Sequence, residues 1–165
     1  MVTSESNQKS NDGTKEQTPE FVIVMGGVCT GKTTFRKEKF ADGYTHIDAG
    51  EIFIQLSQGQ YYDFPCHLEE KMNQIGLDKM RESLKNRKNI VIEIIGENKE
   101  LLINCAEKLK KLNYSNKLIL LQCEPDTALK RNADRDNNNI SAYYCEPYHF
   151  GWVQQAVEGL LNVAS

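Results

Sequence analysis

A short stretch near the N-terminus, FVIVMGGVCTGKTTF, constrains the fold more than any other feature of the sequence. It starts at Phe21 with an apolar run typical of a buried strand and continues into a loop with paired glycines. Gly31 is then followed at once by Lys32 and Thr33, where a helix can begin. The spacing from Gly26 to Thr33 matches G-x-x-x-x-G-K-[ST], the phosphate-binding P-loop. Because this motif joins a strand to a helix, the sequence predicts an α/β fold with a phosphate site.

The residue types of this loop suit the binding of a nucleotide. Glycines let backbone N–H groups approach an anion, and the positive end of the following helix dipole attracts it. Lys32 supplies a charge for the outer phosphates, and the Thr33 hydroxyl is placed to ligate magnesium. The alternative is a glycine-rich turn before a helix capped by Thr30, with Lys32 solvated. The residues predicted to bind nucleotide are Gly26, Gly27, Val28, Cys29, Thr30, Gly31, Lys32, Thr33 and Thr34.

Composition limits the remaining function classes. The 165 residues suit one domain with a core of its own, and the net charge of −3 gives no general attraction to nucleic acid or to anionic membranes. No apolar run approaches the roughly 20 residues needed to cross a bilayer, and the N-terminus does not have the pattern of a signal peptide. The scattered cysteines predict reduced thiols and a cytoplasmic protein, not a disulfide framework or a zinc site: Cys29, Cys66, Cys105, Cys123 and Cys145.

The hydrophobic pattern divides the chain into two segments. Residues 1–19 are almost entirely polar and predict a disordered tail, because such a segment buries too little surface to repay its ordering entropy. Residues 20–165 alternate between strand and helix periods and predict a single domain. Strands are expected at 21–25, 44–48, 89–95 and 117–123, and helices at about 32–40, 49–57, 68–84 with Gly76 inside, and 101–112.

This alternation predicts a three-layer α/β/α fold with a mostly parallel sheet of four or five strands. In such sheets, ligands bind beyond the carboxyl ends of the strands. The polar residues at those ends are therefore candidates for the functional site.

Two of these ends carry carboxylates. Asp48 follows the second strand and is suited to accept a proton from a hydroxyl or to hold a magnesium-bound water. The alternative for Asp48 is the N-cap of the next helix. Glu93 lies inside an otherwise apolar strand and is a candidate for the magnesium site, with Glu97 as its competitor nearer the strand end. Pairing with a lysine, or exposure at the sheet edge, is the alternative for Glu93.

Arginines follow the fourth strand. Pro125 is suited to a helix start, and Arg131 and Arg135 then share one helical face. Planar guanidinium groups stabilise the charge that develops during phosphoryl transfer. A polar, turn-forming run at about 132–146 predicts a mobile lid. The alternative is a solvated helix face with ordinary ion pairs.

This ordered set of residues resembles the small P-loop kinases, and most of all the zeta-toxin-like kinases and their polynucleotide-kinase-like relatives. The resemblance covers roughly residues 20–146, in which the P-loop, Asp48, the carboxylate of the third strand and the arginine helix occur in the same order. Only the P-loop is highly specific. The acceptor region, placed at 58–70 with its aromatic residues, does not identify a substrate.

The resemblance implies an ATP-dependent phosphotransferase that moves the γ-phosphate to a hydroxyl of a small metabolite, such as a nucleotide sugar. It implies ATP and Mg²⁺ as cofactors, Lys32 and Thr33 as their ligands, and Asp48 as the base. It also implies that Arg131 and Arg135 clamp the phosphates, and it raises an antitoxin-like protein as a partner.

Two other functions remain open at this point. One is a nucleotide-binding or slowly hydrolysing switch that has no acceptor. The other is a 5′-hydroxyl polynucleotide kinase, which the acidic balance disfavours and which would need a basic groove that leads to Asp48, formed by Lys71, Lys79 and Arg81.

Overall fold

The sheet at the centre of the molecule consists of four parallel strands. The computed structural model describes residues 17–58, 66–95 and 99–134. The strands are β1 (Glu20–Met25), β2 (Tyr44–Ile47), β3 (Asn89–Ile94) and β4 (Ser115–Leu120), and their order across the sheet is β2-β3-β1-β4. The strand that delivers the P-loop is therefore an interior strand, with β3 on one side and β4 on the other.

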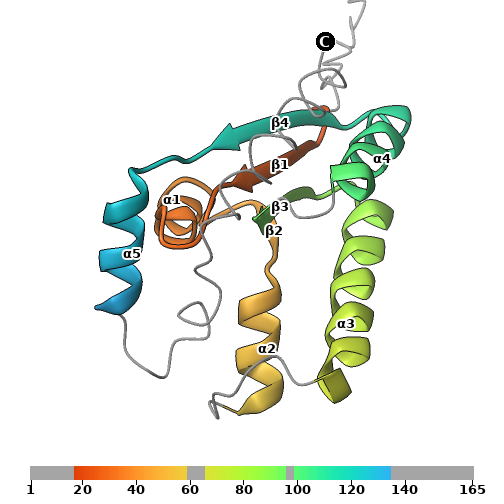
Figure 1. Cartoon of the computed structure of the whole chain (residues 1–165). Coiled ribbons are helices and arrows are strands. Elements are labelled where there is room, and N and C mark those ends of the chain that lie inside the picture. Colours follow the sequence, from red (N-terminus) through yellow and green to blue (C-terminus); the bar gives the residue numbers. More distant parts are fainter. Residues whose placement is uncertain (1–16, 59–65, 96–98, 135–165) are drawn as a thin grey trace, which may run out of the picture.

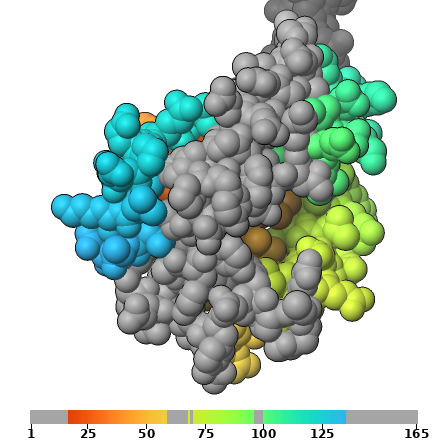
Figure 2. All heavy atoms as spheres, viewed as in Figure 1, coloured from red at the N-terminus to blue at the C-terminus, as the bar shows by residue number. Residues whose placement is uncertain are grey.

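Helices cover both faces of this sheet (Figure 1). They are α1 (Lys32–Lys39), α2 (Ala49–Ser57), α3 (Cys66–Lys85), α4 (Lys99–Lys111) and α5 (Pro125–Ala133). In Figure 1, α1 and α5 lie on one side of the sheet, while α3 and α4 lie on the other. The space-filling view shows the same separation, with α5 in blue at one side and α3 with α4 in yellow-green to green at the opposite side (Figure 2).

Alternation along β1 explains the three layers. Phe21, Ile23 and Met25 are buried in the cluster that contains residues of α3 and α4. Val22 and Val24 are buried on the other face, in the cluster that includes residues of α1. Because β1 is apolar on both faces, it has the pattern expected of a parallel strand with helices on both sides. Burial on both faces fixes the position from which the P-loop starts.

The predicted fold class is confirmed, with small shifts at the element ends. The fourth strand ends at Leu120 and not at Cys123; Leu121 N makes one more hydrogen bond, to Met25 O (2.8 Å), and the chain then continues to Pro125. One continuous helix, α3, includes Gly76. No fifth strand is found within residues 17–58, 66–95 and 99–134.

Several predictions of the sequence analysis fall on other residues. The tail up to residue 16, the aromatic part of the acceptor loop at 59–65 and the chain from residue 135 on, which includes most of the predicted lid, lie outside the described residues. Pro19 is buried, and its carbonyl accepts a hydrogen bond from Ser115 N (2.9 Å). Across the described part of the chain, no helix combines the length and apolar character needed to span a membrane.

Candidate active site

The P-loop begins directly after β1 and ends at α1. Cys29 and Gly31 have positive φ angles of 61° and 93°, which fold the loop back so that α1 can start. Gly31 is the N-cap of α1, with no capping side chain, and Thr30 Oγ1 donates instead to Gly27 O (2.9 Å). The backbone N–H groups of the first helical turn are thus left without a side-chain acceptor at this N-cap, as an anion site requires.

Lys32 is buried, although it carries a charge. Its Nζ donates to Gly26 O (2.9 Å) and Gly27 O (2.7 Å), so the ammonium lies against the glycine backbone of the same loop. A buried ammonium is costly unless it is hydrogen-bonded, and these carbonyls meet that need. Lys32 is therefore held inside the loop that is predicted to surround the phosphates.

Gly26 is required by close packing. A Cβ atom at this position would lie 2.5 Å from Leu121 O and 2.6 Å from Thr30 Oγ1. The first of these is a backbone atom at the end of β4, and it cannot move away cheaply. The P-loop is therefore seated tightly against the carboxyl end of the sheet.

Thr33 and Glu93 are brought together from α1 and β3. Thr33 Oγ1 donates to Glu93 Oε1 (2.7 Å), and the Glu93 side chain is 11% exposed. Since β3 is an interior strand, Glu93 is not at the sheet edge. A hydroxyl and a carboxylate are oxygen donors of the kind that Mg²⁺ prefers, and the remaining ligands of such a site come from phosphates and water. The pair therefore fits a magnesium site, although no cluster of three or more His, Cys, Asp or Glu ligands occurs in the residues that the structure describes.

Asp48 follows the end of β2 and is both a helix cap and a largely buried carboxylate. Its Oδ1 accepts a hydrogen bond from Glu51 N (2.7 Å), so it caps α2. Its Oδ2 lies 3.7 Å from Arg36 Nη2, and the side chain is 13% exposed. Burial and the negative charge of Glu93 raise the pKa of Asp48 to about 6, although the Glu51 N–H and Arg36 act in the opposite direction. Such a carboxyl is suited to exchange a proton near neutral pH.

Arg36 is a part of this cluster that the sequence analysis missed. The residue is completely buried, and its guanidinium contacts Glu93, Glu51 and His46. It lies four positions after Lys32, on the same face of α1, and that face points to the sheet. The helical spacing was thus the one available signal, but an arginine in a polar helix is usually solvent-exposed.

The predicted arginine clamp is described only in part. Arg131, on α5, donates from Nη1 to Cys29 O (3.2 Å), so its guanidinium lies against the P-loop. Asn132 also meets the loop, where Cys29 Sγ donates to its Oδ1 (3.7 Å). Arg135 and Glu97 lie outside the described residues. The start of the lid region therefore contacts the loop predicted to bind ATP.

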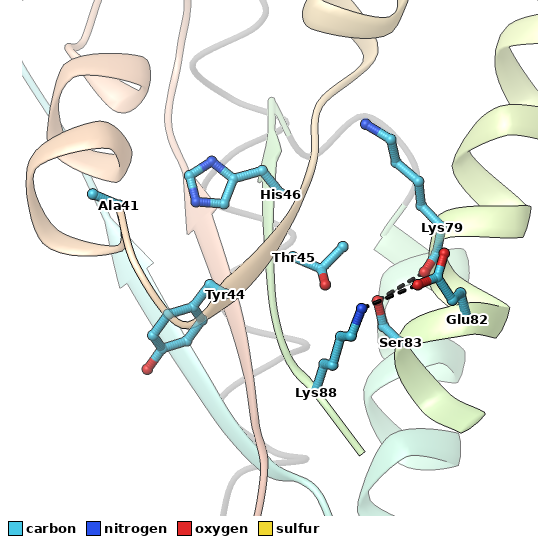
Figure 3. Close-up of a pocket in the computed structure, with 8 residues that line it drawn as sticks. All are labelled: Ala41, Tyr44, Thr45, His46, Lys79, Glu82, Ser83 and Lys88. Carbon is cyan, nitrogen blue, oxygen red and sulfur yellow. Dashed lines mark hydrogen bonds and ion pairs between the residues drawn. The ribbon is translucent and has the colours of Figure 1, made fainter. Parts of the chain in front are cut away.

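A hollow of about 450 Å³ lies elsewhere, between β2 and α3 (Figure 3). Thr45 faces Lys79 of α3 and Lys88, and His46 points to the opposite side of β2. Lys88, which follows α3, is paired with Glu82 (3.0 Å) at its rim. The P-loop and Asp48 do not line this hollow, and we assign it no part in the chemistry.

Comparison with known proteins identifies a family and several structures with a similar fold. The family model described as Zeta toxin matches residues 3–151. A chain of the Pnkp1/Rnl/Hen1 RNA repair complex has a TM-score of 0.64 at 15% identity, over 90% of this chain and 48% of that one. A second structure of the Pnkp1/Rnl/Hen1 complex gives 0.58 at 17% identity, over 72% and 41%. The PezAT chromosomal toxin-antitoxin system of Streptococcus pneumoniae gives 0.55 at 18% identity, over 93% and 68%.

The fold and the site together define a P-loop kinase-type protein. The chain belongs to the Zeta toxin family, since the family model covers most of its length. The chain spans about half or less of the RNA repair chains that it resembles, and the low identities of all three structures establish a common fold alone. Curated proteins give no match in sequence. Family and fold support a kinase-like phosphotransferase.

Proposed function

We propose that this protein transfers the γ-phosphate of ATP to a hydroxyl of a small metabolite, such as a nucleotide sugar. One observation carries the proposal: Asp48, a largely buried carboxyl whose pKa is raised to about 6, shares a guanidinium with Glu93, which accepts a hydrogen bond from the P-loop residue Thr33. A candidate base and the candidate nucleotide site thus belong to one cluster. A protein that only binds nucleotide has no need of a base at this place.

In this mechanism, the P-loop backbone and Lys32 hold the outer phosphates, and Arg131 with Arg135 neutralises the charge that develops on the transferred group. Asp48 accepts the proton of the acceptor hydroxyl, whose oxygen forms a bond to the γ-phosphorus. The bond from that phosphorus to the β–γ bridging oxygen breaks, and ADP carries the electron pair away. Thr33 and Glu93 would hold magnesium, which would supply positive charge to the phosphate oxygens.

The experiment is ATP consumption by the purified protein with magnesium, measured against nucleotide sugars, simple sugars, nucleosides and a 5′-hydroxyl oligonucleotide. The proposal expects one small acceptor to stimulate turnover, and Asp48→Asn to abolish the stimulation. The carboxamide keeps the oxygen that caps α2 but cannot accept the proton at neutral pH. Stimulation by the oligonucleotide alone would favour a polynucleotide kinase, while tight ATP binding without any stimulation would favour a switch.

A further inference from the structure

Arg36 is a buried charge that the proposed reaction does not use. Its side chain is 0% exposed, and its guanidinium nitrogens contact groups on separate elements of the fold. Nε donates to Glu93 Oε2 on β3 (3.0 Å), and Nη2 donates to Glu51 Oε1 on α2 (2.9 Å). Nη1 donates to His46 Nδ1 on β2 (2.6 Å). One residue of α1 therefore joins the nucleotide-binding helix to three neighbouring elements.

Carboxylates outnumber cations in the cluster around Arg36. Asp48, Glu51 and Glu93 all lie within ion-pair distance of its guanidinium, and Lys37 Nζ lies 3.4 Å from Glu51 Oε1, the oxygen that Arg36 also contacts. Burial opposes the charge of Arg36, but hydrogen bonds to Glu51 and Glu93 raise its pKa above the ordinary value. The guanidinium thus stays charged, and without it these neighbouring carboxylates would repel one another.

His46 completes the arrangement and fixes its orientation. Its Nε2 lies 2.5 Å from Phe40 O, which can only accept, so Nε2 carries the proton. Nδ1 then carries the lone pair that accepts from Arg36 Nη1. The backbone after α1 therefore determines the tautomer of His46, and the tautomer directs the guanidinium.

We propose that Arg36 is a positioning residue that fixes Glu93 and Asp48 relative to the P-loop. Because Glu93 Oε2 is held by Arg36, Oε1 is turned to Thr33, which is the arrangement that the magnesium site needs. The role requires a planar fork with several donors, and a lysine at this position would keep the charge but lose that fork. This inference rests on the proposed function, whose site it completes.

The first test compares Arg36→Lys with Arg87→Lys. Arg87 is a matched control, because it also makes several contacts, to Leu112 O, Asn113 O and the ring of Tyr114, but it follows α3 at the amino ends of the strands. ATP affinity is measured by calorimetry with magnesium and with a chelator. Arg36→Lys is expected to lose about tenfold or more of the affinity gained from magnesium, the usual cost when a ligand loses its supporting partner. Arg87→Lys is expected to keep that gain even where it unfolds more readily.

The same variants are then compared in phosphate transfer, with the acceptor that stimulates the wild-type protein. Arg36→Lys should lower kcat by about 10- to 100-fold, and KM for ATP should rise in step with the loss of ATP affinity in magnesium. The affinity measurement needs no acceptor. A wild-type protein that transfers phosphate to no acceptor would therefore overturn the proposed function, while the measured ATP affinities would still decide the role of Arg36. The role of Arg36 would be overturned if a folded Arg36→Lys variant gained as much ATP affinity from magnesium as the wild-type protein does. It would also be overturned if the wild-type protein gained no ATP affinity from magnesium.

A second pair of variants decides the matter if Arg36→Lys does not fold. His46→Asn keeps an acceptor near the place of Nδ1, while His46→Gln keeps only a donor near that of Nε2. The asparagine variant should retain both the increase in ATP affinity caused by magnesium and the wild-type kcat, and the glutamine variant should lose part of both. If both variants fold and behave alike, Arg36 is not held by His46 and the proposal is wrong.

Discussion

At the two ends of the sheet, the pKa of a carboxyl beside a cation is shifted in opposite directions. At the amino ends, Glu20 accepts from Lys117 Nζ through one oxygen and from the Tyr44 hydroxyl through the other. Hydrogen bonds from these groups lower the pKa of Glu20, and that of Tyr44 rises to about 12. At the carboxyl ends, burial and the charge of Glu93 raise the pKa of Asp48 to about 6.

The difference lies in the balance of donors and charges. Each oxygen of Glu20 has a donor of its own, so its charged form is satisfied. Asp48 shares the guanidinium of Arg36 with Glu51 and Glu93. Its Oδ2 lies 3.7 Å from that group, farther than the oxygens of the other two carboxylates. A cluster with more carboxylates than cations keeps a group ready to take up a proton, which a purely structural ion pair does not. Under the proposed function, the carboxyl ends of the strands carry the chemistry, while the ion pair at the amino ends contributes to stability.

The largest expected effect comes from replacing the carboxylate of Asp48, with the replacement of Glu20 as the comparison. Asp48→Asn should lower the rate of phosphate transfer by about 10²- to 10⁴-fold, the usual contribution of a general base, while ATP affinity is kept. Glu20→Gln should leave the rate unchanged. Steady-state kinetics with both variants checks this, and equal rates in the two variants would remove the distinction between the ends of the sheet.

Glycines at the two ends give the next largest difference. Gly26→Ala should destabilise the fold by about 1–3 kcal/mol through overlap with Leu121 O, and it should weaken ATP binding because the P-loop must shift. Gly43→Ala meets no atom within 4 Å but has φ at 78°, so it should cost about 1 kcal/mol for the left-handed backbone and leave ATP affinity intact. Urea denaturation and calorimetry measure both effects. Equal loss of ATP affinity in the two variants would contradict the packing argument.

The pH dependence of transfer tests Asp48 more finely. A base works in its ionised form, so kcat should rise as the pH increases through about 6 and then level off. The Glu20→Gln profile should overlay that of the wild-type protein. A midpoint close to 3.8, the ordinary value for an aspartate, would show that burial and Glu93 do not act on Asp48 as the structure indicates.

The smallest effect is expected in stability at the amino ends. The folded pKa of Glu20 is lowered, so its contribution is present above the ordinary value of 4.5 and is lost as the pH falls through the folded pKa. Glu20→Gln should therefore cost about 1 kcal/mol or less at neutral pH, and the difference should vanish in acid. Unfolding midpoints in urea at the two pH values provide the measurement. A difference that persisted in acid would mean that Glu20 acts through its shape and not through its charge.

The sequence predicted the parts of this molecule that depend on neighbours along the chain. The strands and helices follow from hydrophobic period, and the motif places Lys32 and Thr33 at the start of α1. The cap formed by Asp48 was one of the two roles considered for it, and a cap also depends on nearby residues. These features are local, which is why a single sequence contains them.

The rest depends on contacts between distant residues. Arg36 and Glu93 are separated by 57 positions, and nothing in their local sequences indicates that they meet. The raised pKa of Asp48 likewise arises from burial and from Glu93, which are properties of the folded sheet. The sequence identified the carboxylates but not the buried guanidinium that holds them together.

In the proposed function, the cluster around Asp48 directs phosphate to an organic hydroxyl. The most direct measurement follows the label from [γ-³²P]ATP in the presence of magnesium and the stimulating acceptor, in the wild-type protein and in Asp48→Asn. The account predicts that the label appears in the acceptor with the wild-type protein and that Asp48→Asn prevents it. Label found only in inorganic phosphate, at the same rate in both proteins, would contradict the account.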